Sequence, residues 1–258
     1  MRLVVIGDIH AQEDKLWRML DESGLRDEGG APTPELLDGT TRLVLLGDLV
    51  HAKSRAIYAQ LAGVTTYDEY DPGHVRRVER AQEAFLHRVH AFLDPVPDGI
   101  AHVLLGNHDH NAVEPHQGPL RSDDISHLEW KPGYGSHLPE ALAAWIRRWP
   151  RSLEVEGIHL AHVGPREEHN VFDNDFYRLN RRRWIYEDHD YLAETPHRLG
   201  VYGHTPVRGG LNVASQGKAL LLDANGYGDE YAWLDVRIDE DAYRVRLRGL
   251  VFDEVLAR

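Results

Sequence analysis

Five short segments of this sequence combine an apolar run with a glycine and an Asp, Asn or His side chain. They read VVIGDIH at 4–10, VLLGDLVH at 44–51, VLLGNHDH at 103–110, LAHVG at 160–164 and VYGHTP at 201–206. Glycine permits a tight turn off a strand end and a close approach of the backbone to a ligand. The polar residues are therefore expected at the carboxyl edge of a sheet, where open α/β folds bind their ligands.

The spacing of apolar residues predicts an α/β fold. Runs typical of strands lie at Leu3–Ile6, Leu43–Leu46, Ala101–Leu105, Ile158–Val163, Leu199–Tyr202, Ala219–Leu222, Tyr231–Ile238 and Tyr243–Val251. The first three are continuously apolar, as in strands buried on both faces. Helical spacing marks the stretch from Val75 to Leu93, and a second helix is expected over Leu138–Trp149, stopped by Pro150. This order of elements favours helices packed outside one or two central sheets.

The chain length favours a single domain over residues 1–258. Within it, 111–150 is expected to be an insertion of loop and helix. The part from Asn111 to Gly135 is rich in Pro, Gly, His and Asp, which predicts an extended loop. Such a loop is either a lid over a binding site or a plain surface insertion, and both interpretations stay open here.

Composition excludes several classes of protein. No apolar run approaches the roughly 18 residues of a membrane span, and the N-terminus lacks the long apolar region of a secretory signal. The absence of cysteine excludes disulfides and thiolate metal sites, and a cytoplasmic location is expected. A net charge of −13 argues against a general nucleic-acid-binding surface.

The side chains at the strand ends are suited to a divalent metal. Asp8 and His10 lie two residues apart, so they share one side if the strand continues through them. Oxygen and imidazole ligands without sulfur suit Mn²⁺, Fe or Zn²⁺. A two-metal hydrolase needs a carboxylate between ions about 3.5–4 Å apart, and Asp48 is the expected bridge. Each motif alone also has a structural explanation, and GNHD is compatible with a simple turn.

The ordered set GDIH, GDLV, GNHD, AHVG and GHTP resembles the calcineurin-like metallophosphoesterases. Within them, GHTP and the stretch LLLDANGYGDEYAWLDV at 220–236 look like the phosphoprotein-phosphatase branch. Bacterial serine/threonine phosphatases, diadenosine tetraphosphatases and the phosphatase module of bacterial polynucleotide kinase-phosphatases share these features. The resemblance spans residues 3–236, with 52–100 and 111–150 unmatched in detail.

The resemblance implies a four-layer α/β/β/α sandwich with two divalent metal ions at the strand ends, Mn²⁺ first and Fe or Zn²⁺ as alternatives. The metal ligands that it implies are Asp8, His10 and Asp48 for one ion, and Asp48, Asn107, His162 and His204 for the other. His108 matches the residue that protonates the leaving-group oxygen. The implied reaction is in-line attack on phosphorus by a hydroxide that bridges the two ions.

The second motif departs from the branch, which usually has GDxVDRG at this place. His51 replaces the Asp that orients the general-acid His, and Ala52 replaces a phosphate-binding Arg. Without that carboxylate the pKa of His108 is expected to fall. His51 itself and Asp109 are candidates to support the His108 ring.

The cation that grips the phosphate and the support of the ligand histidines have several candidates. The candidate cations are Lys53, Arg55, Arg181 and Arg182. Arg181 and Arg182 belong to a basic cluster that is also compatible with a solvated helix face. Asp223 in the closing motif is a candidate to hold a ligand His, with turn capping as the alternative.

The histidines of the insertion, outside the motifs, are expected to be solvent-exposed loop residues, with a lid that approaches the site as the alternative. These residues are His110, His116, His127 and His137.

Three functions remain after these observations. The first is a metal-dependent phosphomonoesterase that acts on a phosphoprotein or a small phosphorylated molecule, with no membrane partner. The second is hydrolysis of a dinucleoside polyphosphate or a nucleic-acid end, with bases stacked on aromatic residues of the insertion. Those aromatic residues are Trp130, Tyr134, Trp145 and Trp149, although the spacing of the last two favours core packing. The third is a catalytically impaired metal-containing module that binds phosphorylated partners; the altered second motif favours it and His108 argues against it.

Overall fold

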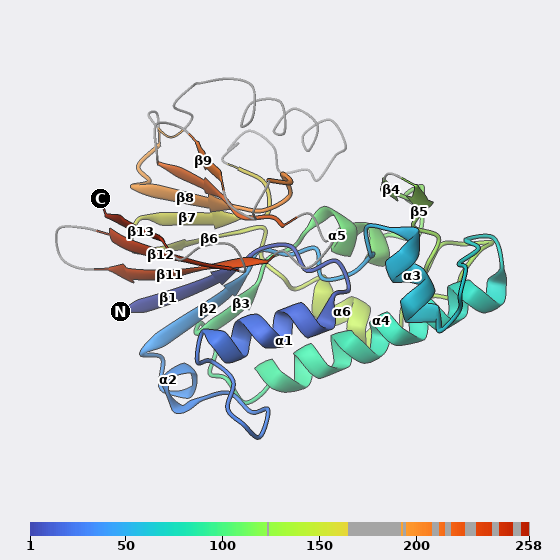
Figure 1. Ribbon diagram of the computed structural model, residues 1–258, viewed down its shortest axis with the longest axis horizontal. Helices are drawn as coiled ribbons and strands as arrows, with labels where there is room; N and C mark the ends of the chain where they lie inside the picture. Colours follow the sequence, from blue (N-terminus) through green and yellow to red (C-terminus); the bar gives the residue numbers. More distant parts are fainter. Residues whose placement is uncertain are drawn as a thin grey trace.

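The computed structural model of the chain describes residues 1–122, 124–164, 192, 195–207, 212–214, 218–224, 231–238, 243–249 and 254–257. Over these residues two sheets pack face to face, and helices cover the outer face of the larger sheet (Figure 1). The predicted α/β sandwich is confirmed, and described residues form three of its four predicted layers.

The larger sheet has the strand order β13-β12-β11-β1-β2-β3. Its strands are β1 (Arg2–Ile6), β2 (Thr41–Leu45), β3 (Ala101–Val103), β11 (Ala232–Ile238), β12 (Tyr243–Gly249) and β13 (Glu254–Ala257). β1, β2 and β3 are parallel, with Ile6 opposite Leu45 and Leu45 opposite Val103. Their carboxyl ends therefore meet at one edge of the sheet.

The smaller sheet has the order β6-β7-β8-β10-β9. Its strands are β6 (Ser152–Val155), β7 (Ile158–Ala161), β8 (Leu199–Tyr202), β9 (Asn212–Ala214) and β10 (Ala219–Leu221). β7, β8 and β10 are parallel to one another. A separate pair of short strands, β4 (Arg121–Ser122) and β5 (Ile125–Ser126), lies away from both sheets in Figure 1.

The described helices are α1 (Glu13–Glu22), α2 (Pro34–Leu37), α3 (Arg55–Ala62), α4 (Pro72–Leu93), α5 (Asn107–Val113) and α6 (Glu140–Ile146). α1, α4 and α6 lie against the larger sheet (Figure 1). Within the described ranges, every helix falls short of the length and apolarity that a membrane crossing requires.

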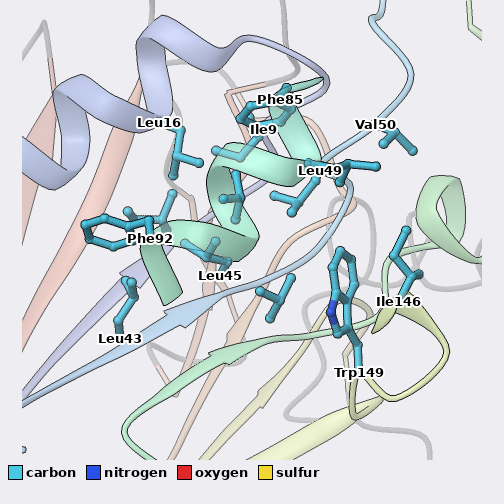
Figure 2. Close-up of a cluster of buried hydrophobic side chains, with 14 of the residues drawn as sticks. Ile9, Leu16, Leu43, Leu45, Leu49, Val50, Phe85, Phe92, Ile146 and Trp149 are labelled. Atoms are coloured by element: carbon cyan, nitrogen blue, oxygen red, sulfur yellow. The ribbon is translucent and has the colours of Figure 1, made fainter. Parts of the chain in front are cut away.

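The continuous apolar run of β1 follows from burial on both faces. Leu3 and Val5 belong to the cluster between the two sheets, together with residues of β7, β8 and β10. Val4 and Ile6 point the other way, into the cluster that the helices cover. Figure 2 shows this second cluster, in which Leu16 of α1 and Phe85 and Phe92 of α4 lie near strand β2. Burying each such side chain stabilises the fold by about 1.5–3 kcal/mol.

α4 begins where the sequence supplies a start signal. The Asp71 carboxylate accepts hydrogen bonds from the backbone N–H groups of Gly73 and His74, and Pro72 fills the first helical position. The predicted apolar stripe from Val75 to Phe92 is buried as expected. Glu79 and Gln82 on the same helix are buried as well, although a polar residue on an amphipathic helix is expected to face solvent.

Most of the stretch from Asn111 to Gly135 is irregular, as the sequence predicts, but it includes short regular elements and packs against the rest of the protein. Its first residues belong to α5, and β4 and β5 form a short hairpin. The stretch 127–131 is buried throughout. It is held against α4, because the Glu79 carboxylate accepts hydrogen bonds from the N–H of Trp130 (2.9 Å) and of Ser136 (2.8 Å). The predicted helix over Leu138–Trp149 is present as the shorter α6.

Candidate metal centre

The six predicted metal ligands all lie just beyond strands of the two sheets. Asp8 and His10 follow β1, Asp48 follows β2, and Asn107 begins α5 after β3. His162 and His204 follow β7 and β8 of the smaller sheet. GNHD is thus the start of a helix rather than a simple turn.

The side chains of these residues converge around one carboxylate oxygen, Asp48 Oδ2. It lies 3.4 Å from His162 Nε2 and 3.6 Å from His10 Nε2, and His10 Nε2 lies 3.5 Å from Asp8 Oδ2. Asn107 Oδ1 lies 3.0 Å from both His162 Nε2 and His204 Nδ1. The larger sheet therefore supplies the carboxylates and the smaller sheet supplies two imidazoles.

Glycines at the strand ends make this convergence possible. A Cβ on Gly106 would lie 2.3 Å from Asp48 Oδ1, and a Cβ on Gly203 would lie 2.3 Å from Asp8 Oδ1. A Cβ on Gly106 would also lie 2.3 Å from the Asp48 backbone nitrogen, so that position requires glycine, whereas a Cβ on Gly203 would displace the buried Asp8 carboxylate. At each of these positions the missing side chain leaves room for the carboxylate of a residue that follows another strand.

Three of the ligand residues have a strained backbone conformation, which sets the direction of their side chains. His10, Asp48 and His204 have φ angles of 48°, 51° and 61°, in the left-handed region that residues other than glycine rarely adopt. Such strain costs on the order of 1–3 kcal/mol per residue and gathers at functional sites. β1 ends at Ile6, so strand alternation does not bring Asp8 and His10 together; the left-handed turn after the strand does.

Backbone carbonyls fix the orientation of two ligand rings. His10 Nδ1 donates to the carbonyl of His51 at 3.1 Å, and His162 Nδ1 donates to the carbonyl of Leu46 at 2.9 Å. In both rings Nε2 is left to face the cluster. Metal-binding histidines commonly have their second nitrogen held in this way.

The electrostatics of the cluster favour a positive charge. Burial alone would lower the pKa of His162, but the carboxylates of Asp48 and Asp8 outweigh it and raise the pKa to about 9. Burial and the Asp223 carboxylate raise the pKa of Asp8 well above its usual range. A bound cation would balance the same carboxylates.

The donor set fits divalent metal ions. Asp48 Oδ2 and His10 Nε2 are buried and have no hydrogen-bond partner in the part of the chain that the structure describes. Such orphaned atoms are costly unless something else satisfies them, and a bound cation does so. Close sets of donors are formed by Asp48, His162 and His204 and by Asp8, His10 and Asp223. All are oxygen or imidazole donors, which suit Mn²⁺, Fe or Zn²⁺.

His108 lies beside this cluster. Its backbone N–H donates to Asp48 Oδ1 at 2.8 Å, and its Nε2 atom lies 4.0 Å from Asp48 Oδ2. Lys53 Nζ is 3.1 Å from His108 Nε2, and His51 Nδ1 is 3.2 Å from His108 Nδ1. Burial, and then the Lys53 ammonium, lower the pKa of His108 well below its usual range, in the direction expected from the sequence.

Two predicted supporting carboxylates differ in their contacts. Asp109 does not reach His108: its carboxylate accepts from the backbone N–H groups of Leu49 (2.9 Å) and Gly106 (3.3 Å). It therefore ties the loop after β2 to the loop after β3. Asp223 is buried near Asp8 and His10, as a residue that supports ligands would be.

The four residues predicted to bind the phosphate differ in where they lie relative to the cluster. Lys53 lies at the cluster, next to His108. Arg55 instead forms an ion pair with Glu69 at 2.8 Å and donates to the carbonyl of Asp124 at 2.7 Å. Its predicted role in substrate binding is therefore without support from its contacts. Arg181 and Arg182 lie outside the described residues.

The expected exposure of the insertion histidines is wrong for His127. His116 and His137 are exposed and His110 is half-buried, but His127 is fully buried and stacks on His51. The apolar residues Ile125, Leu128 and Trp130 around it were the signal in the sequence that this stretch is packed. The residues that contact its nitrogens, Tyr58 and Ser122, carry no motif.

Comparison with known protein families gave a match over most of the chain. The sequence model of the calcineurin-like phosphoesterases matches residues 1–238. A comparison with curated protein sequences gave no match.

Two solved structures share the fold. A cold-active protein tyrosine phosphatase covers 96% of this chain and 78% of its own, with 14% identity and a TM-score of 0.55. A protein serine/threonine phosphatase from Saccharomyces cerevisiae covers 96% of this chain and 79% of its own, with 12% identity and a TM-score of 0.53. At these identities the likeness shows the fold alone.

Proposed function

This chain belongs to the calcineurin-like phosphoesterase family, and we propose that it is a metal-dependent phosphatase with two divalent ions. Its substrates would be phosphomonoesters, on a phosphoprotein or on a small phosphorylated molecule. The observation that carries the proposal is the convergence of His10 and His162 on the unpartnered Asp48 Oδ2 atom. Mn²⁺ is the proposed metal, with Fe and Zn²⁺ as alternatives.

The proposed ligands are the six residues of the cluster, with Asp48 shared between the two ions. Bound there, the ions would supply Lewis-acid polarisation of the phosphoryl group and activation of water. His108 is proposed to protonate the leaving oxygen, since its Nε2 atom lies beside Asp48. Lys53 is proposed to bind the phosphate in place of the Arg that this chain lacks.

The packing of the aromatic residues does not favour the nucleotide alternative. Trp130 and Trp149 are buried, and Trp145 packs edge-on against Trp149 with ring centroids 4.9 Å apart. Trp130 and Trp149 therefore serve the core, and Trp145 is half-buried beside it. Tyr134 is exposed and remains without a partner ring among the residues that the structure describes.

A substrate panel tests the proposal. The Mn²⁺-loaded protein is assayed with phosphomonoester, phosphodiester and dinucleoside polyphosphate substrates. We expect metal-dependent hydrolysis that is fastest on monoesters. Asp48→Asn should abolish it, and His108→Ala should lower kcat by about 10²–10⁴-fold, the usual contribution of a general acid.

Exposed residues provide the matched controls. Asp98→Asn and His116→Ala make the same chemical changes on the surface and should leave turnover unchanged. Equal background turnover in the wild type and both site variants, with metal still bound, would sink the proposal and favour a binding module. Faster turnover of diesters or dinucleoside polyphosphates would replace the proposed substrate class.

A further inference from the structure

Three buried imidazoles form a group of their own beside the metal ligands. The rings of His51 and His127 stack, with centroids 4.7 Å apart and an interplanar angle of 7°. His108 packs edge-on against both, at 5.3 Å from His51 and 4.9 Å from His127. All three side chains are at least nine-tenths buried.

The two stacked rings are held firmly from outside the cluster. His127 contacts the Tyr58 hydroxyl through Nδ1 at 2.7 Å and the Ser122 hydroxyl through Nε2 at 2.8 Å. The backbone N–H of His51 donates to Gln82 Oε1 at 2.7 Å. α3, α4 and the insertion thus all help to set the position of the His51 ring.

The hydrogen bonds of His108 define its tautomer. The Lys53 ammonium can only donate, so His108 Nε2, 3.1 Å away, must accept. The proton of the neutral His108 ring is then on Nδ1, which donates to His51 Nδ1 at 3.2 Å. The His51 proton is left on Nε2, which has no hydrogen-bond partner among the described residues. A buried N–H without an acceptor lowers the stability of the folded protein.

We propose that His51 and His127 are positioning residues that hold His108 as its Nδ1–H tautomer, with Nε2 turned toward Lys53 and Asp48. This rests on the proposed function: Nε2, unprotonated in the neutral ring, first takes a proton from the Lys53 ammonium 3.1 Å away and then passes it to the leaving oxygen, while Nδ1–H stays bonded to His51 and solvent returns a proton to Lys53. In this proposal the two imidazoles orient the His108 ring, as the carboxylate that the related GDxVDRG motif has at residue 51 does. His51 supplies the acceptor, and His127 fixes the plane of the His51 ring.

A third metal site in this group is disfavoured. Three imidazoles with nitrogens within 4.8 Å of one another are a possible ligand set. However, hydroxyl groups contact both nitrogens of His127, so a metal would have to displace one of them. The Lys53 ammonium next to His108 would also repel a second cation.

Two substitutions of His51 distinguish the effect of its hydrogen bond to His108 from the effect of its aromatic ring. His51→Phe keeps an aromatic ring but removes the acceptor, whereas His51→Asn keeps an acceptor oxygen near the Nδ1 position. The Zn²⁺-loaded protein, labelled with ¹⁵N-histidine, is examined by long-range ¹H–¹⁵N NMR, which distinguishes protonated from unprotonated ring nitrogens. Turnover of a phosphomonoester is measured on the same samples, and thermal unfolding verifies that each variant is folded.

In the wild type we expect a protonated Nδ1 and an unprotonated Nε2 for His108. His51→Phe should mix the tautomers and lower kcat by about 10- to 100-fold, with KM changed less than about threefold. His51→Asn should restore both readouts. If His51→Phe does not fold, His127→Ala, which removes the stacked ring, should lower kcat in the same way. His116→Asn, exposed in the same insertion, is the control.

A neutral wild-type His108 that carries its proton on Nε2 and not on Nδ1, or a His51→Phe protein with unchanged tautomer and kcat, would overturn the proposal. Loss of one bound metal ion in His127→Ala would also overturn it and make the group a metal site. Absence of any wild-type turnover would defeat the proposed function instead, and the NMR result would still decide the positioning role.

Discussion

His162 carries the charge that links protonation of the site to metal binding. Its Nδ1 atom donates to the carbonyl of Leu46, and its Nε2 atom faces Asp48 and Asn107. Both nitrogens are protonated when the pKa is about 9 and the pH is neutral. A metal ion must displace the Nε2 proton before it can bind this ring.

We therefore predict that metal binding releases protons at neutral pH. The folded pKa of His162 lies above its ordinary value of 6.5, so protonation stabilises the metal-free fold below about pH 6.5, and this stabilisation is lost as the pH rises through about 9. Metal affinity should rise with pH over the same window. Calorimetric titration with Mn²⁺ in buffers of different ionisation enthalpy measures the protons released. Release that is absent at pH 7, or that does not decline above pH 9, would contradict this assignment.

At the scale of elements, α4 supports both the core and the wall of the site. One face carries the apolar stripe against β2 and β3, as the sequence predicts. Glu79 and Gln82 lie on the same buried face nearer the start of the helix, and they hold the insertion and the His51 backbone. The insertion is thus fixed by polar contacts to a helix and is not a free loop.

We predict that Glu79→Ala loosens the insertion. It leaves the N–H groups of Trp130 and Ser136 without their acceptor, and each unsatisfied buried donor costs about 1–3 kcal/mol. Urea denaturation should show this loss of stability, and hydrogen exchange should accelerate over residues 127–136. Arg80→Ala, at an exposed position of the same helix, is the control. Unchanged exchange in Glu79→Ala would mean that the insertion is held by other contacts.

Local patterns predicted the elements that pack through apolar periodicity. Leu199–Tyr202 is β8 with the predicted bounds, and the stripe beginning at Val75 lies in α4. The bounds of α1 and α3 were not predicted, although α1 buries Leu16, Met19 and Leu20 at helical spacing. The hydrogen bond between His127 and the Tyr58 hydroxyl joins residues far apart in the sequence, so no local pattern predicts it.

At the scale of the whole molecule, the candidate site lies where the two sheets meet. The apolar cluster between the sheets fixes how β1 and β2 sit relative to β7 and β8. The ligands from the larger sheet and those from the smaller sheet are therefore brought together by the core itself. The six ligands were expected from the family resemblance that the local strand-end motifs carry, whereas the distances between them depend on this packing.

Locating the metal ions is the most direct test of the central claim. The protein is crystallised with Mn²⁺, and anomalous scattering is measured at the manganese edge. We predict two peaks that share Asp48, one also bound by Asp8 and His10 and the other by Asn107, His162 and His204. A single peak, two peaks that do not share Asp48, or ions bound away from these residues would contradict the claim.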